Sequence, residues 1–316
     1  MQICLLRELG HLHMKPLLGV IAAVGLAGAF GSASDAQTGD GDLSFSLGLT
    51  VSNSDNIAFL SGAGVSSDDD SSITLRGSAN GKWQIGDNGR LSLDYAFSGT
   101  RYSAIGSRDN NLHLGTATYT HRVGVSVLGG SYAIGRYQLD GEDFLEIDVA
   151  SLFFGTPGPW GWVLVGRYTA TEKTFDAALS ERDASADSVG ISASRRFGDT
   201  RIRLELSQAG EDASSDFLDN NSTTVSINLS QPLRLIDQPL RLSLTAGISE
   251  RSYDRLDPYY GVTREDTRRR YQAALSREFD SGLSITGSAS HLDSSSNLPS
   301  ANYDQTIISF SINQRF

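Results

Sequence analysis

Six charged side chains in the second half of the chain have a spacing that could place them on one face of a β-sheet. They are Arg201, Arg203, Glu205, Arg241, Arg268 and Arg270. Residues two apart in a strand point to the same side, so 201, 203 and 205 project together if 200–208 is a strand. Arginines that line a pore favour anionic solutes. The alternative is that they brace the wall by pairing with acidic neighbours, namely Glu205, Glu250, Asp254, Asp257, Glu265 and Asp266.

Residues suited to catalysis or metal binding are sparse. After residue 36 the chain has three histidines, His113, His121 and His291, and it has no G-x-S-x-G, H-E-x-x-H or paired-histidine spacing. The acidic run SSDDDSS (66–72) lacks the ligand spacing of a calcium loop. The one cysteine, Cys4, precedes the expected cleavage site, which excludes a disulfide or zinc-thiolate site from the rest. We therefore expect no enzyme activity, no cofactor and no metal site.

The N-terminus has the pattern of an export signal. Met14 and Lys15 precede the apolar run PLLGVIAAVGLAGAFGSASDA, and cleavage after Ala36 fits the small-residue rule. We expect residues 1–36 to be a signal peptide with a leader, Met14 being an alternative start, and residues 37–316 to be one exported domain. No later apolar stretch is long enough for a transmembrane helix.

The rest of the chain repeats with period two in pieces of about ten residues. The clearest piece, TRIRLELSQ, sets Ile202, Leu204 and Leu206 against arginine, glutamate and serine. The predicted strands are 43–51, 73–83, 90–99, 111–121, 124–137, 144–154, 162–170, 187–197, 200–208, 223–231, 239–249, 268–279, 282–290 and 306–316.

This pattern predicts an all-β fold, a transmembrane antiparallel β-barrel of about fourteen strands. Short turns such as GDNG and GDT alternate with longer polar segments near 52–71, 102–110, 138–143, 172–186, 209–222, 250–267 and 291–305. Short periplasmic turns and longer external loops are typical of barrels in the outer membrane of Gram-negative cells. A soluble β-sandwich or β-helix is disfavoured because the polar face carries too many small and charged residues to be a core. The net charge of −11 disfavours nucleic acid as a partner.

The alternation also predicts which side chains meet lipid. We expect Leu112 and Leu114 to face outward and His113 and Tyr119 to face the lumen. In the last strand, Ile308, Phe310, Ile312 and Phe316 form the apolar face. A terminal strand that ends on an aromatic residue resembles the signal read by the barrel assembly machinery, which we expect to be a partner together with the lipid bilayer.

The C-terminal part, 250–316, is similar to the last hairpins of the surface lipoprotein assembly modifier family. SERSYDRLDPYYGVTREDTRRRYQAALSREF and HLDSSSNLPSANYDQTIISFSINQRF carry the resemblance. The matching positions are Asp257, Pro258, Gly261, Arg264, Glu265, Asp266, Ser296, Asn297, Tyr303, Asp304, Arg315 and Phe316. The resemblance implies a fourteen-stranded outer-membrane barrel that moves a lipid-anchored or secreted client protein to the cell surface. The chain departs from the family because it lacks a helical tetratricopeptide-repeat domain before the barrel.

Three functions are compatible with these observations. The resemblance favours a transport pore that assists protein or lipoprotein translocation. The absence of a repeat domain favours either a porin-like diffusion channel for small, anionic solutes or a surface barrel whose loops bind a partner. An anion preference would distinguish the second function from the first.

Overall fold

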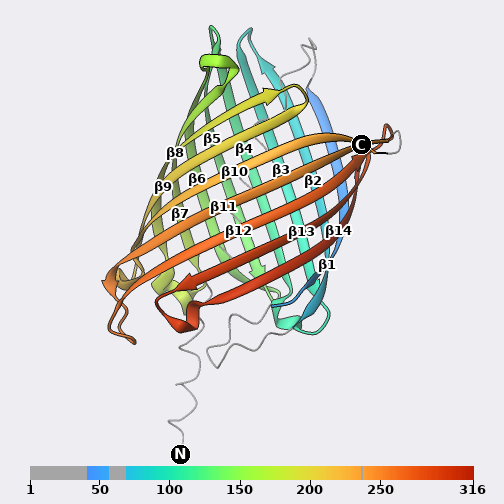
Figure 1. The fold of residues 1–316 in the computed structure, drawn as a ribbon. Helices are drawn as coiled ribbons and strands as arrows, with labels where there is room; N and C mark the ends of the chain where they lie inside the picture. Colours follow the sequence, from blue (N-terminus) through green and yellow to red (C-terminus); the bar gives the residue numbers. More distant parts are fainter. Residues whose placement is uncertain (1–40, 57–68, 236–237) are drawn as a thin grey trace, which may run out of the picture.

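The computed structural model describes residues 41–56, 69–235 and 238–316, which form one closed antiparallel β-barrel (Figure 1). The predicted leader lies outside the described residues. The strands are β1 Asp42–Ser54, β2 Asp70–Ile85, β3 Gly89–Tyr102, β4 Asn110–Val123, β5 Ser126–Leu139, β6 Glu142–Pro157, β7 Val163–Phe175, β8 Ala184–Phe197, β9 Thr200–Ala213, β10 Asn220–Leu235, β11 Gln238–Leu256, β12 Thr263–Glu278, β13 Leu283–Ser296 and β14 Tyr303–Arg315. No helix among these residues is long and apolar enough to cross a membrane.

Each strand pairs with the next in the sequence, and β1 closes the ring by pairing with β14. The closing register aligns Leu49 with Ile312 and Thr50 with Ser311. Phe316 lies one residue beyond β14 but still exchanges backbone hydrogen bonds with Phe45, at 2.9 and 3.2 Å. The prediction of fourteen antiparallel strands is confirmed, and no strand edge is left unpaired.

The apolar and polar faces of the strands are the outer and inner walls of the barrel. Along β1, Leu43, Leu47 and Val51 are each about half exposed, as expected for the face that meets lipid. Lys173 of β7 and Glu211 of β9 lie on the polar face and form an ion pair of 2.7 Å across the intervening strand β8. These polar side chains are largely buried whereas the apolar ones are exposed, so the polar face lines the lumen.

The two ends of the barrel differ in their connections. At the turn end, which also holds Arg315 and Phe316, the described connections between strands are 86–88, 124–125, 158–162, 198–199 and 279–282. At the loop end they are 103–109, 140–141, 176–183, 214–219, 257–262 and 297–302.

Most strands extend into the segments predicted as loops, because pairing continues beyond the apolar band. The extreme case is 138–143, where the connection is only Asp140 and Gly141, with φ of 52° and 84°. These values match the left-handed pair of a two-residue hairpin turn, which Asp-Gly favours.

Four loops at the loop end share one construction. Each contains a short 3₁₀ turn, η1 Gly106–Arg108, η3 Ala177–Arg182, η4 Asp216–Leu218 or η5 Pro299–Ala301, and then an Asp or Asn. That side chain accepts a hydrogen bond from the backbone N–H at or near the end of the preceding strand, as between Asp109 and Tyr102 (2.8 Å) and between Asp219 and Ala213 (2.8 Å). The carbonyls of Asp109 and Asp219 in turn accept from the N–H groups of Asp140 and Asp254. The loops are thereby tied into a hydrogen-bonded rim.

A compact apolar cluster fills part of the lumen near the loop end. Its buried members are Tyr137, Phe144, Leu145 and Ile147, and Leu112, Leu139, Val149, Phe175 and Leu179 pack around them. The alternation in β4 suggested that Leu112 and Leu114 would face lipid. That expectation for Leu112 is wrong, because it pairs in register with Ser98 and Tyr137 on the inner face. Leu114 faces inward for the same reason, opposite Ala96 and Gly135.

Candidate pore lining

Basic side chains outnumber acidic ones at the inward-facing positions of the described strands. The register and alternation place Arg76, Lys82, Arg90, Arg122, Arg167, Lys173, Arg196, Arg201, Arg203, Arg241, Arg251, Arg264, Arg268, Arg270 and Arg315 on this face. The acids on the same face are Asp42, Asp70, Asp94, Glu205, Glu211, Asp266 and Glu278. Most other inward positions are the small residues Ser, Thr, Gly or Ala.

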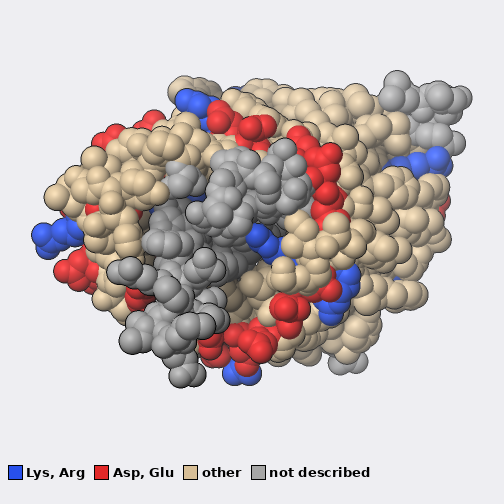
Figure 2. All heavy atoms as spheres, turned by 90° about the horizontal axis from the view of Figure 1, so that it is seen from below, with Lys and Arg blue, Asp and Glu red and all other residues tan. Residues whose placement is uncertain are grey.

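The acidic residues gather instead at the rim. Figure 2 looks onto the loop end and shows Asp and Glu around much of the mouth. Exposed members of this rim are Asp55, Asp140, Glu142, Asp143, Asp176, Glu181, Asp212, Asp216, Asp254, Glu265 and Asp304. The net negative charge of the chain therefore lies largely outside the lumen, and the lumen itself is basic.

The structure places all six predicted pore-lining residues on the inner face. Arg203 donates to Glu205 at 2.5 Å, and Glu205 also accepts from Ser226 at 3.3 Å. Arg241 is exposed and donates to the Ser230 hydroxyl at 3.1 Å. Among the described residues neither Arg201 nor Arg241 has a carboxylate within ion-pair distance. The pairing of Arg203 with Glu205 thus fits a role in stabilising the wall, whereas Arg201 and Arg241 are charges that face the lumen.

Arg268 and Arg270 belong to a second group, which lies nearer the loop end on β11 and β12. Arg264 forms a buried two-pronged ion pair with Asp266, at 2.6 and 2.5 Å, and lies over the ring of Tyr253 at 4.8 Å. Arg268 lies within electrostatic reach of Arg264 and of Arg270. Buried, bidentate pairs of this kind fix the wall in shape.

Two arginines on the loops also enter this end of the lumen. Arg108 of η1 lies near Tyr102 and Tyr137, and Arg182 of η3 lies near Glu181 and Tyr253. Burial lowers the pKa of both guanidinium groups from the usual value. Tyr253 belongs to β11 and Arg182 follows β7, so the η3 loop reaches across part of the mouth.

Sequence reasoning missed Arg167 of β7. Val165 lies on the same inner face of β7, so the alternation of apolar and polar residues did not identify that face as polar. Its guanidinium lies 5.2 Å from the centre of the Phe153 ring, which is itself buried. The Arg167 Nη2 atom is buried and has no hydrogen-bond partner among the described residues.

The histidines do not line the lumen. His113 pairs in register with Phe97 on the outer face and shares a hydrogen bond of 2.8 Å with the Tyr95 hydroxyl, so its predicted inward placement is wrong. Tyr119 also faces outward, opposite Leu91 and within 3.4 Å of His121 Nδ1. His291 shares a hydrogen bond of 3.1 Å with the Thr306 hydroxyl. No group of three metal-ligating side chains occurs in the described ranges.

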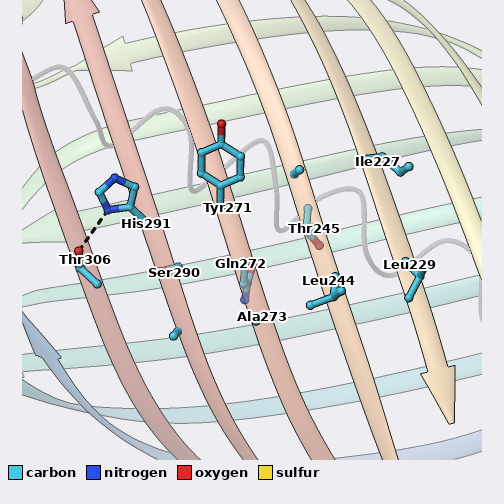
Figure 3. A pocket seen from close by; sticks show the side chains of 12 residues that line it. Ile227, Leu229, Leu244, Thr245, Tyr271, Gln272, Ala273, Ser290, His291 and Thr306 are labelled. Atoms are coloured by element: carbon cyan, nitrogen blue, oxygen red, sulfur yellow. Dashed lines mark hydrogen bonds between the residues drawn. The ribbon is translucent and has the colours of Figure 1, made fainter. Parts of the chain in front are cut away.

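A hollow of about 500 Å³ lies on the outer wall across β10 to β14. Ala246, Ala273 and Ala289 are among the small residues that line it, and the side chains of Tyr271 and His291 stand in front of their strands (Figure 3). The residues of the predicted assembly signal lie on the same outer face. Ile308, Phe310, Ile312 and Phe316 are between 43% and 72% exposed, and their role in assembly stays a prediction.

The fold is similar to those of solved outer-membrane proteins. No family model matches the chain, and no curated protein matches it. The anion-selective porin from Comamonas acidovorans is 11% identical, with a TM-score of 0.53 over 88% of this chain and 99% of the porin. Outer-membrane expressed OmpT of Vibrio cholerae is 9% identical, with a TM-score of 0.55 over 89% of this chain and 100% of OmpT. At these identities the likeness shows the fold alone, a closed antiparallel β-barrel of the outer-membrane kind.

Proposed function

We propose that the protein is an outer-membrane channel through which small anionic solutes diffuse passively. The observation that carries this proposal is the excess of basic over acidic side chains on the inner wall of a chain whose net charge is −11. A low-dielectric wall that carries one sign of charge concentrates counter-ions in the lumen. The likeness to an anion-selective porin supports a pore of this kind.

Solute flux into liposomes tests this proposal. The purified protein should speed the swelling of liposomes in small anions more than in cations of the same size, with neutral sugars between them. Equal rates for both signs of charge would exclude the arginines as a selectivity element. No flux above that of protein-free liposomes would exclude an open channel.

Translocation of a lipid-anchored or secreted client is the second candidate, and its basis is the resemblance over 250–316. In the structure several matching residues shape the last loops: the Asp257 carboxylate accepts from the backbone N–H groups of Tyr259 and Tyr260, and Arg264 pairs with Asp266. These contacts are local and would serve a barrel of either function. Loss of a surface-displayed lipoprotein on deletion of the gene would favour translocation, and unchanged display would disfavour it.

A further inference from the structure

A cradle on the inner wall positions the guanidinium of Arg167. A Cβ atom added at Gly129 of β5 would collide with the Phe153 ring, so this glycine lets the ring lie flat against the wall. Phe153 of β6 is only 6% exposed and is paired in register with Arg167 of β7. A guanidinium within about 6 Å of an aromatic face is held there by the ring's quadrupole. The orientation of Arg167 is therefore built into three adjacent strands.

One donor of this guanidinium is left unsatisfied. Arg167 Nη2 is buried and without a hydrogen-bond partner among the described residues, although most buried polar groups are bonded. An unmade hydrogen bond of a charged group costs more than that of a neutral one. The missing partner is an acceptor, and an anionic acceptor would suit the site best.

A second guanidinium lies nearby across β8. Arg167 lies within electrostatic range of both Arg203 and Glu205. Glu205 accepts hydrogen bonds from Arg203 and Ser226, whereas Arg167 Nη2 has no hydrogen-bond partner among the described residues. The strand between the two arginines presents only small groups to the lumen, Gly190, Ser192 and Ser194. Small side chains of β8 thus lie between two inward-facing arginines, and the Glu205 carboxylate lies beside Arg203.

We propose that Arg167 and Arg203, over the floor of β8, bind an oxyanion as it passes through the lumen. The ligand is a carboxylate or phosphate group on a small solute, because a planar guanidinium donates two parallel hydrogen bonds to such a group. The serine hydroxyls of the floor are further donors for the same group. This site deepens the proposed function and rests on it for the identity of the solute, but binding itself can occur in a closed barrel.

Ligand-induced stabilisation and channel block test the site separately. The probes are inorganic phosphate and acetate, with chloride at equal ionic strength as the reference, added to the purified full-length protein. A ligand that binds only the folded state raises the unfolding temperature in proportion to its occupancy. We expect phosphate, acetate or both to raise the unfolding temperature and to interrupt single-channel current in a saturable way.

Three variants complete the design. Arg167→Gln should weaken oxyanion binding by about tenfold or more, because it removes both the positive charge and the planar guanidinium that donates two parallel hydrogen bonds. Arg167→Lys retains the charge, so its affinity for the oxyanion should lie between those of the wild type and Arg167→Gln. Arg136→Gln removes an arginine from the outer face of β5 and should leave oxyanion binding unchanged.

The outcomes separate this site from the proposed function. Binding that depends on Arg167 but occurs without current would support the site and contradict the open channel. Current without saturable binding, or binding equal in the wild type and in Arg167→Gln, would overturn the site. A response to phosphate alone would identify a phosphate-bearing solute, and a response to acetate would identify a carboxylate.

Discussion

At the residue scale, the phase of the alternation decides which side chains meet water and which meet lipid. Every second residue of β9 faces the lumen, so Arg201 and Arg203 project inward while Ile202 and Leu204 project outward. Arg241 joins them from β11, where it pairs with Ser276 on the inner face. The low-dielectric wall of the barrel concentrates the electric field in the lumen, where these charges lie.

Replacing Arg201, Arg203 and Arg241 together with serine should reduce anion selectivity. We expect the anion-to-cation permeability ratio, measured from the reversal potential in a potassium chloride gradient, to fall by about tenfold at low salt. The matched control is Arg136, Arg195 and Arg277 replaced with serine, since these three lie on outward-facing positions. A ratio that falls equally in both triple variants would remove the inner arginines from the explanation.

Gly129→Ala should destabilise the barrel, because the new Cβ would lie 2.5 Å from Phe153 Cε2 and 2.9 Å from the Tyr119 carbonyl oxygen. Overpacking of this kind costs about 1–3 kcal/mol of unfolding free energy. Gly166→Ala is the control, since nothing lies within 4 Å of its added Cβ. Urea unfolding in detergent measures both, and equal midpoints would contradict the packing described for Phe153.

The sequence was sufficient to place Arg201, Arg203 and Arg241, because their neighbours alternate cleanly with apolar residues. It was insufficient for His113, whose strand has leucine on one face and histidine, glycine and tyrosine on the other. A shift of one residue exchanges the two faces of a strand. The phase of β4 is set by its partners, since Phe97 of β3 fixes the outward direction of His113.

At the scale of the elements, ion pairs across strands hold the loop end of the wall. Lys173 and Glu211 are 8% and 18% exposed and bridge β7 and β9 at 2.7 Å. Arg251 of β11 lies within electrostatic reach of both. These contacts join strands that share no backbone hydrogen bonds.

Lys173→Met should destabilise the barrel by at most about 3–5 kcal/mol, since it removes the ion-pair partner of the Glu211 carboxylate while Arg251 stays within its electrostatic reach. The double variant Lys173→Met with Glu211→Leu should recover most of the loss. Arg136→Ala is the control, because its 3.4 Å pair with Glu146 is exposed and worth about 0–1 kcal/mol. Equal losses for the exposed and buried pairs, measured by urea unfolding, would show that Lys173 does not bridge the strands.

The existence and order of the strands were predictable, but their ends were not. The apolar band marks only the part of each strand that meets lipid, whereas pairing continues beyond it into Ser- and Asp-rich sequence. Asp70 shows why: it was placed in a loop, yet it belongs to β2 and its carboxylate accepts from the backbone N–H groups of Ser103, Ala104 and Ile105. Hydrogen bonds between residues so far apart in the sequence cannot be recognised from local composition.

At the scale of the whole molecule, charge is separated between the rim and the lumen. The acidic rim around the loop end surrounds a mouth that leads to a basic inner wall (Figure 2). A net charge of −11 alone would suggest a preference for cations. A permeating ion responds to the local electric field in the lumen rather than to the net charge of the chain. We therefore expect the basic inner wall to determine the ion selectivity.

The most direct test of this account is the single-channel current of the purified protein in a planar bilayer under a gradient of potassium chloride. The account predicts steady open steps and a reversal potential whose sign is that expected when chloride permeates more readily than potassium. The preference should weaken as the salt rises from about 0.1 M to 1 M, because the Debye length falls from about 10 Å to about 3 Å. A silent barrel, or open steps that prefer potassium, would contradict it.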